Sequence, residues 1–283
     1  MTEQELKQYK EWGLHLIPLK DGTKVPDSKK FWVKQKGNGK LIPEWCWKKN
    51  PETKEFIKWS DEELLKAKRL GINHEACSVI DVDCDAVEGS QFMSEFPETL
   101  TIGKKVNGST YIRKKIYKYD GLTEHKSFGS KETGAVIENL AHTQSWLFGD
   151  GRITLNNVKP KTLTDDQYKR LKESVREVYA LTMLTKLYPK KDTNRDAFSM
   201  ALTGTLLRET NWNNDKIKSF IKRLCNAVGE SSIHTKKRLE KVDRFRENLD
   251  DPDKRVWGVQ KLTELCGVDK KIGLDFIDAI KPE

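Results

Sequence analysis

Alternation of apolar and polar positions predicts several short strands in the first half of the chain. Residues 14–19 alternate before a turn rich in Lys, Gly and Pro, and residues 77–86 (CSVIDVDCDA) contain a β-branched run. Asn107-Gly108, between two apolar-rich runs, is a dipeptide typical of a tight hairpin turn. Residues 134–151 predict a further strand pair. The first half therefore predicts a domain built on strands.

Helical patterns accompany these strands and then replace them. Residues 2–12 predict one helix, and Ser60 followed by acidic residues predicts a second that ends at Gly71. A short helix is expected near residues 87–95. From about residue 164 onward, apolar positions recur at helical spacing. We therefore expect an α+β (mixed α/β) domain over residues 1–160, followed by an all-α helical bundle over residues 161–283.

Asp81 and Asp83 stand out because the strand predicted around them is otherwise apolar. Successive residues of a strand face opposite sides, so both carboxylates share a face, with about 7 Å between their Cα atoms. Unpaired, they would be repelled and desolvated. A divalent cation such as Mg²⁺, which prefers oxygen ligands, would relieve both costs. The simpler alternative is that one Asp starts a turn and the other is solvated. Asp85 is expected beyond the strand, with no metal role.

Charge and cysteine content narrow the class of partner. The 283-residue chain has a formal net charge of +9, which favours a polyanionic partner such as nucleic acid. Its five cysteines form no C-x-x-C pair, so we expect neither a disulfide framework nor a zinc site. The first residues have no apolar core, and no apolar run approaches the length of a membrane span. We therefore expect a cytoplasmic protein with no membrane partner.

The order of the motifs is more informative than any one of them. The stretches "WGLHLIPLKDGTKVP" and "KWSDEELLKAKRLGIN" precede the Asp-x-Asp strand, and "TIGKKVNGSTYIRK" and "AVIENLAHTQSWLFGDG" follow it. Over about residues 11–150 this order resembles the bifunctional primase-polymerase branch of the archaeo-eukaryotic primase superfamily. The helical part more loosely resembles the C-terminal helical domain that often follows such modules. The resemblance implies a prim-pol catalytic domain followed by a helical domain for template binding and initiation.

The resemblance also implies a set of site residues. It matches Asp81 and Asp83 to the family's metal-binding pair and Glu138 to its third carboxylate, so the three would be catalytic residues that ligate two Mg²⁺ or Mn²⁺ ions. The family's second motif usually has a His where this chain has Thr110, whose hydroxyl can still donate to a phosphate oxygen but carries no proton-linked charge. The nucleotide-binding candidates are Lys105, Ser109, Thr110, His142, Lys24 and Arg113.

These assignments predict a DNA-directed primase-polymerase of a plasmid, phage or similar mobile element. It would use dNTPs or NTPs on a single-stranded DNA template. The reaction joins a 3′-hydroxyl to an α-phosphate, and two metal ions roughly 3.5–4 Å apart can stabilise the attacking and leaving oxygens. A basic helical domain would hold the template through phosphate contacts, with Trp212 available to stack on a base. The template-binding candidates are Arg195, Arg208, Lys222 and Arg223.

Two other functions are compatible with the same motifs. The Thr at the family's His position is also expected in a replication initiator whose primase domain no longer catalyses but still binds DNA. Carboxylate clusters also serve hydrolysis, so a metal-dependent nuclease is the other alternative. The chain contains no Walker A sequence G-x-x-x-x-G-K-[ST] and therefore no helicase motor. A replicative helicase would be a partner, in a longer form of the protein or as another chain.

Overall fold

A computed structural model gives a mixed α/β chain whose C-terminal part is helical, as expected from the sequence. The structure describes residues 1–19, 32–34, 41–43, 55–56, 58–123, 126–129, 137–140, 144–190, 192–249, 251, 254 and 256–281. The chain divides into two compact units. Unit 1 comprises Met1–Cys84, Met93–Ser127 and Glu138–Leu171, and unit 2 comprises Asp85–Phe92, Phe128–Ile137 and Lys172–Glu283. The main division falls inside α5 (Asp165–Leu187), beyond the expected boundary at residues 160/161.

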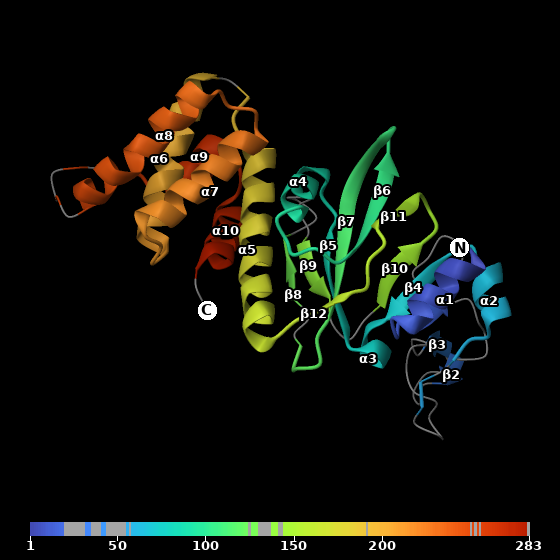
Figure 1. Ribbon diagram of the computed structural model, residues 1–283. Helices are drawn as coiled ribbons and strands as arrows, with labels where there is room; N and C mark the ends of the chain where they lie inside the picture. The colour runs from blue at the N-terminus through green and yellow to red at the C-terminus, as the bar shows by residue number, and fades with distance from the viewer. Residues whose placement is uncertain are drawn as a thin grey trace. The chain divides into compact units, whose positions relative to one another are not determined.

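Two sheets form the framework of unit 1. A three-stranded antiparallel sheet consists of β1 (Leu16–Pro18), β4 (Leu70–Asn73) and β10 (Gln144–Phe148), in the order β1-β4-β10. A larger sheet has the order β11-β6-β7-β5-β9-β8, with β12 paired to β7 (Figure 1). Its strands are β5 (Val79–Cys84), β6 (Leu100–Val106), β7 (Ser109–Lys118), β8 (Lys126–Phe128), β9 (Ile137–Leu140), β11 (Arg152–Asn156) and β12 (Lys161–Thr162). A separate pair consists of β2 (Trp32–Lys34) and β3 (Leu41–Pro43).

The core of unit 1 joins the first helix to both sheets. α1 (Glu3–Glu11) confirms the helix predicted over residues 2–12, and the side chain of Thr2 caps its first turn. Leu6 and Tyr9 of this helix are buried and belong to one apolar cluster with Ile72 of β4 and with buried side chains of the larger sheet. Figure 1 shows α1 beside the three-stranded sheet. Burial of this shared apolar surface fixes the two sheets against each other.

The helix that begins after Ser60 is shorter than predicted. α2 (Asp61–Lys66) has the expected cap at Ser60, but the prediction that it continues to Gly71 is wrong. Gly71 instead lies in β4, where all four residues are buried between β1 and β10. A Cβ atom at Gly71 would approach the carbonyl oxygen of Ser145 to 2.9 Å. Burial in the sheet therefore outweighs the local helical pattern, and the glycine permits a close approach of two strands.

The two predicted hairpins have different outcomes. The turn at Asn107-Gly108 is confirmed: it joins β6 to β7, and both residues have positive φ, of 49° and 79°. Asn and Gly tolerate this left-handed region better than other residues. Residues 134–151 do form two strands, but β9 and β10 belong to different sheets, so the prediction that they pair is wrong. Their partners lie elsewhere in the sequence.

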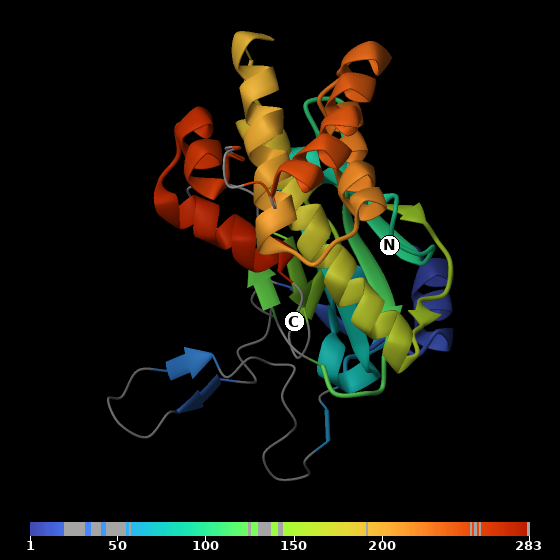
Figure 2. The ribbon, with the colours of Figure 1, turned by 90° about the vertical axis from the view of Figure 1, so that its left-hand side faces the viewer.

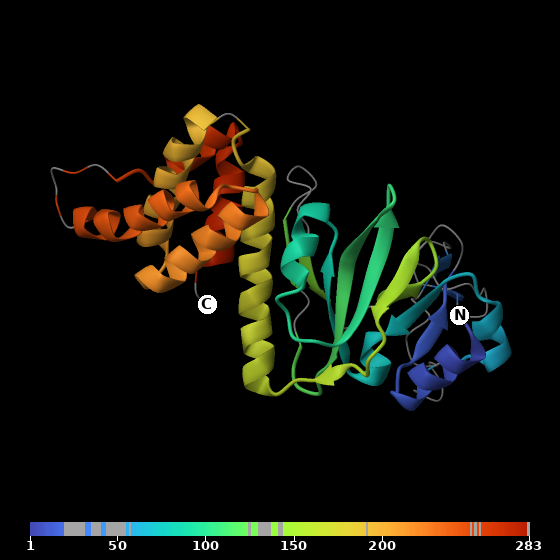
Figure 3. The same cartoon turned by 45° about the horizontal axis from the view of Figure 1, so that its top comes forward.

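Helices make up the rest of the chain. The short helix predicted near residues 87–95 is present as a 3₁₀ turn followed by α4 (Ser90–Met93), and α3 (His74–Cys77) precedes β5. In unit 2, α6 contacts α7, α8, α9 and α10, so these helices form one bundle (Figures 2 and 3). The bounds are α6 (Asp192–Glu209), α7 (Asn214–Ala227), α8 (Ser232–Leu249), α9 (Val259–Cys266) and α10 (Lys270–Ile280).

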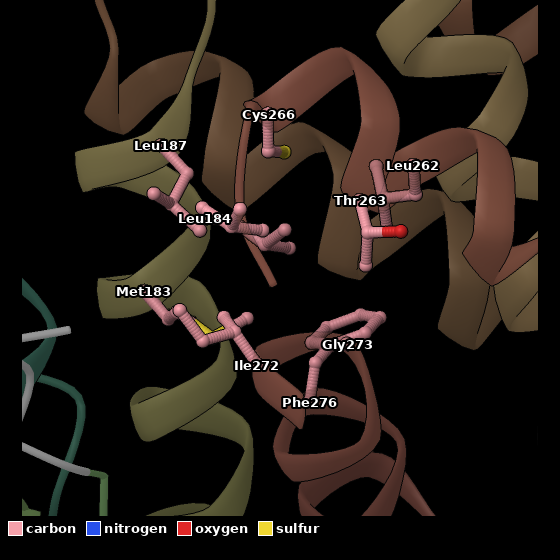
Figure 4. Close-up of a pocket in the computed structure, with 10 residues that line it drawn as sticks. Met183, Leu184, Leu187, Leu262, Thr263, Cys266, Ile272, Gly273 and Phe276 are labelled. Atoms are coloured by element: carbon pink, nitrogen blue, oxygen red, sulfur yellow. The ribbon is translucent and has the colours of Figure 1, made fainter. Parts of the chain in front are cut away.

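The bundle contains a small apolar cavity between α5, α9 and α10. Its volume is about 10 Å³, and its wall includes Met183, Cys266 and Phe276 (Figure 4). A cavity of this size holds at most about one water molecule, and a water needs polar partners. Burial raises the pKa of the Cys266 thiol to about 12, so the thiol stays protonated and unreactive at neutral pH. The cavity is a packing gap and not a ligand site.

Close backbone packing in unit 2 gives a stability prediction at Gly204 of α6. A Cβ atom there would overlap the carbonyl oxygen of Trp257 and contact Val256. Ala normally favours a helix over Gly by about 1 kcal/mol. We expect the opposite for Gly204→Ala, a loss of more than about 2 kcal/mol, because backbone must move. Gly258→Ala is the control, since its Cβ would make only an ordinary contact. Equal urea midpoints for Gly204→Ala and the wild type would contradict this packing.

Candidate active site

The two carboxylates of the Asp-x-Asp motif are buried in the larger sheet. Asp81 is 0% exposed and Asp83 is 3% exposed, so the alternative of a solvated residue at a strand end is wrong. Their strand, β5, is an interior strand between β7 and β9. Asp81 pairs with Ile116 and Asp83 pairs with Lys114 in the antiparallel ladder. Asp85 lies after the end of β5, as predicted.

A lysine from the neighbouring strand bridges the two carboxylates. The Nζ atom of Lys114 donates to Oδ2 of Asp83 at 2.5 Å and to Oδ2 of Asp81 at 3.0 Å. Burial raises the pKa of the Asp81 carboxyl to about 6, although the Lys114 charge opposes that rise. Burial by itself would lower the pKa of Lys114, but attraction to both carboxylates outweighs it and raises that pKa. The lysine therefore stays charged.

A β-bulge brings a second cation to Asp83. In the β6–β7 ladder Ile102 pairs with Lys114 and Gly103 pairs with Ile112, so Arg113 is the extra residue of β7. A bulge re-aims the side chain of the inserted residue. Nη2 of Arg113 lies 3.9 Å from Oδ1 of Asp83, although its sequence neighbour Lys114 contacts the same carboxylate. Two consecutive residues of one strand thus reach a single group.

The three-stranded sheet supplies a polar connection to Asp81. The Ser145 hydroxyl on β10 donates to Oδ2 of Asp81, and its Oγ lies 2.6 Å from Nε2 of His74. A hydroxyl has one proton, so Nε2 of His74 must be the donor to Ser145. All three side chains are 1% exposed or less. Asn73 caps α3 by accepting from the backbone N–H of Ala76, which fixes the position of His74. The arrangement holds Asp81 in one orientation.

An arginine cluster lies beside Asp83. The guanidinium of Arg152 stacks on the Trp146 ring, with 3.8 Å from its central carbon to the ring centroid, and that of Arg69 lies at 4.8 Å. Asp150 forms ion pairs with Arg69 (3.4 Å) and with Arg152 (3.8 Å). Burial lowers the pKa of Arg152, the Asp83 charge opposes that change, and Arg113 adds to it. We call Arg69, Arg113 and Arg152 the arginine cluster.

A tight turn positions Arg152 of the arginine cluster. Gly149, Asp150 and Gly151 have positive φ values of 95°, 57° and 73°, and the backbone N–H of Arg152 donates to the carbonyl of Gly149. A Cβ atom at Gly149 would approach the carbonyl oxygen of Lys68 to 2.5 Å. Gly is the residue that accepts both constraints. The sequence "FGDGR" therefore turns the chain sharply from β10 into β11.

The carboxylate oxygens of Asp81 and Asp83 are suitable ligands for a divalent cation, but Lys114 already contacts two of them. Mg²⁺ and Mn²⁺ bind carboxylate oxygens. Oδ1 of Asp81 is buried and accepts no hydrogen bond from the described residues, so it has free ligand capacity. Lys114, however, already bridges the two Oδ2 atoms. A divalent ion that ligated the two Oδ2 atoms would have to compete with the lysine ammonium for them, because like charges repel at such short range.

The predicted third carboxylate lies on the strand next to the pair. Glu138 on β9 is half-buried and accepts a hydrogen bond from the Ser127 hydroxyl at 2.7 Å. Within the part of the chain that the structure describes, no group of three or more His, Cys, Asp or Glu side chains is arranged to hold a metal. The structure therefore does not gather Glu138 with Asp81 and Asp83 into one ligand set. Its role as a ligand stays a prediction.

The predicted nucleotide-binding residues lie in different places. Lys105, Ser109 and Thr110 are exposed beside the turn of the β6–β7 hairpin, where Lys105 pairs with Thr110. Of the predicted set, Arg113 is the residue that the structure brings to the carboxylates. Lys24 and His142 lie outside the described residues. The predicted set is therefore only partly assembled around the Asp-x-Asp pair.

The predicted template-binding residues in unit 2 divide into two kinds. Arg208 and Lys222 are exposed, whereas Arg195 donates to the carbonyls of Pro189 and Lys190. Arg223 donates to Glu177 at 3.0 Å, so it also serves the fold of the bundle.

The aromatic residue proposed for base stacking is also committed to the bundle. Trp212 is 8% exposed and packs against Phe220, which makes the stacking prediction wrong for the conformation described. An aromatic platform for bases must present its ring face to solvent. Template contact in unit 2 is thus limited, among the predicted residues, to the exposed cations Arg208 and Lys222.

Reasoning from the sequence missed several residues of the site. Lys114 was within reach of such reasoning, because it lies on a predicted strand and a charge opposite a carboxylate is a favoured cross-strand pair. His74 is buried, and its link to Asp81 through Ser145 was not foreseen. Ser145 and Arg152 carry no local motif. They reach the site because β10 pairs with β4 and β11 pairs with β6.

No protein-family model matches the chain, and no curated protein matches it in sequence. Among the helices in the described ranges, none combines the length and the apolar character that crossing a membrane requires. Function is therefore inferred from the residues of the site and from the sequence motifs around them.

The ionic bridge gives a stability prediction. Lys114→Met leaves two carboxylates buried without their cation, so we expect a loss of about 3–5 kcal/mol. Lys115→Met is the matched control, because within the described ranges the Lys115 ammonium donates only to the carbonyls of Phe96 and Pro97. We expect about 1–2 kcal/mol for that change. The measurement is urea unfolding in EDTA.

A compensating variant checks the cause of the loss. Adding Asp81→Asn and Asp83→Asn to Lys114→Met removes the uncompensated charges and should restore part of the stability. A Lys114→Met protein no less stable than Lys115→Met would contradict the bridge.

Proposed function

We propose that this protein is a DNA-directed primase-polymerase that performs template-dependent nucleotidyl transfer. The observation that carries the proposal is the pair of buried carboxylates, Asp81 and Asp83, on one face of an interior strand. Burying two neighbouring carboxylates is costly, and a site that binds divalent cations is a reason to keep them. The ordered motifs around the pair, which resemble those of the prim-pol branch, give the reaction class.

The described side chains suggest how such a site would work. When bound, divalent ions would stabilise charge on the attacking and leaving oxygens of the transferred phosphate. Asp81 and Asp83 would hold those ions, and Glu138 is the proposed third ligand. Ser145 orients Asp81 by donating to its Oδ2 atom. The Lys114 ammonium would leave the carboxylates for an anion that arrives with the ions, such as a phosphate oxygen.

The proposed substrates and partners follow from charge and exposure. The net charge of +9 favours a nucleic acid, and single-stranded DNA is the proposed template, with dNTPs or NTPs as substrates. Arg208 and Lys222 are exposed cations of unit 2 that can contact template phosphates. Such contacts give affinity without sequence specificity. A replicative helicase of the same mobile element is the proposed protein partner.

A second function is favoured by the lysine bridge itself. Lys114 neutralises the pair at 2.5 Å and 3.0 Å with nearly complete burial, which is also how a site that has lost its metal ions would be stabilised. In that case the chain would be a replication initiator that binds DNA without catalysis. The two functions differ in whether a divalent cation replaces the ammonium.

Primer synthesis on unprimed circular single-stranded DNA tests the first function. Supplying rNTPs and dNTPs separately, with Mg²⁺ or Mn²⁺, we expect short products in at least one mixture. Asp81→Asn and Asp83→Asn should each reduce product at least about a hundredfold, because each removes a metal ligand, while template binding is retained. Glu98→Gln is the control, since Glu98 is an exposed carboxylate of the same unit. Full synthesis by both Asp variants would refute the assignment.

Metal binding separates the two functions when synthesis is absent. In a primase-polymerase, Mn²⁺ titration followed by electron paramagnetic resonance should show binding that Asp81→Asn abolishes. In a non-catalytic initiator the wild type should bind DNA but neither Mn²⁺ nor nucleotide at this site. Shortening of the DNA without nucleotides would instead indicate hydrolysis and contradict both.

A further inference from the structure

Arg152 has buried hydrogen-bond donors that the fold does not use. Its side chain is 7% exposed, and its Nε and Nη1 atoms donate no hydrogen bond to any described residue. The contact with Asp150 is an ion pair at 3.8 Å, too long for a hydrogen bond. A buried donor without an acceptor loses its hydration and gains nothing in return. Such a donor in a folded protein calls for an explanation.

The charged side chains around Arg152 indicate the charge of a partner for its unused donors. Arg69 and Arg113 complete the arginine cluster, and Lys114 lies on the carboxylates next to Arg113. Asp83 and Asp150 offset part of this positive charge, but Asp83 is already engaged by Lys114. Three guanidinium groups in one place repel one another unless anions separate them. An anion with several acceptor oxygens would both accept from the unused donors of Arg152 and offset this repulsion.

We propose that Arg152, together with Arg69 and Arg113, forms a phosphate-binding subsite beside Asp83. A guanidinium presents its donors as a planar fork, which matches two oxygens of one phosphate. Arg69 and Arg113 have 14% exposed side chains and Asp150 has 44%, so the cluster reaches the surface and a ligand can enter. The identification of the ligand as the triphosphate of an incoming nucleotide rests on the proposed function. The proposal that a phosphate binds here rests only on the geometry of the arginine cluster.

The stack of Arg152 on Trp146 serves this role by holding the guanidinium plane. The 3.8 Å separation fixes the orientation of the fork before a ligand binds, which lowers the entropy cost of binding. A purely structural role, in which Arg152 only covers the Trp146 ring, is the competing explanation. Met in place of Arg152 keeps an unbranched side chain over the ring but has no donors. The two explanations therefore differ in the behaviour of Arg152→Met.

Binding of inorganic triphosphate in EDTA tests the subsite without metal or nucleotide. Isothermal titration calorimetry should show binding to the wild type, weakened at least about tenfold by Arg152→Met, because charge-assisted hydrogen bonds are lost. Arg152→Lys should lie between the two, since it keeps the charge but not the fork. Arg244→Met, at an exposed arginine of unit 2 with no proposed binding role, should bind like the wild type. Equal affinity in Arg152→Met and the wild type, with both folded, would overturn the subsite, as would no binding to the wild type.

The concentration dependence of primer extension separates this inference from the proposed function. If both hold, Arg152→Met raises the KM for dNTP more than it lowers kcat. Extension with an unchanged KM would overturn the subsite and leave the function standing. If the wild type synthesises nothing, loss of triphosphate binding in Arg152→Met would still support the subsite, and the Mn²⁺ titration would then decide the function. Circular dichroism of each variant confirms that the fold is intact.

Discussion

The contact between Lys114 and the two carboxylates of β5 is the constraint on which the site depends. Three charged side chains leave water here, at a cost of several kcal/mol for each ion. The cost is recovered only if the ammonium meets both Asp81 and Asp83 at hydrogen-bond distance, as it does. A shift of one residue in the β5–β7 pairing would turn these side chains to the opposite face. The ion pairs of the site therefore form only in this register of the β5–β7 pairing.

Several departures from regular sheet geometry converge on the same carboxylates. The bulge at Arg113 allows two neighbouring residues of β7 to reach Asp83. The turn from Gly149 to Gly151 brings Arg152 over Trp146 and close to the same group. Bulges and positive φ values cost energy relative to regular strands, and such features cluster at functional sites. Their location beside the Asp-x-Asp pair supports the choice of this region as the candidate functional site of unit 1.

The helical unit shows why net charge is a poor guide to a binding surface. Glu230 is almost fully buried and accepts from Arg238 at 2.9 Å and from Tyr188 at 2.8 Å. Arg195 lies 3.7 Å from the same carboxylate, and Arg223 is paired to another one. These cations hold helices together, because a buried carboxylate needs partners. Only the exposed cations of this unit that are not used in such contacts remain to bind an external polyanion.

Local sequence determined the helix caps at Thr2 and Ser60, the Asn107-Gly108 turn, the helical character of the second half and the shared face of Asp81 and Asp83. Each depends on residues close together in the chain, so propensity and periodicity suffice to predict them. Tertiary structure alone decided that Gly71 lies in a strand, that β9 and β10 join different sheets, and that His74, Ser145 and Arg152 meet the carboxylates. These outcomes depend on strand pairing across the chain, which is set by the burial of apolar faces and leaves no local signal in the sequence.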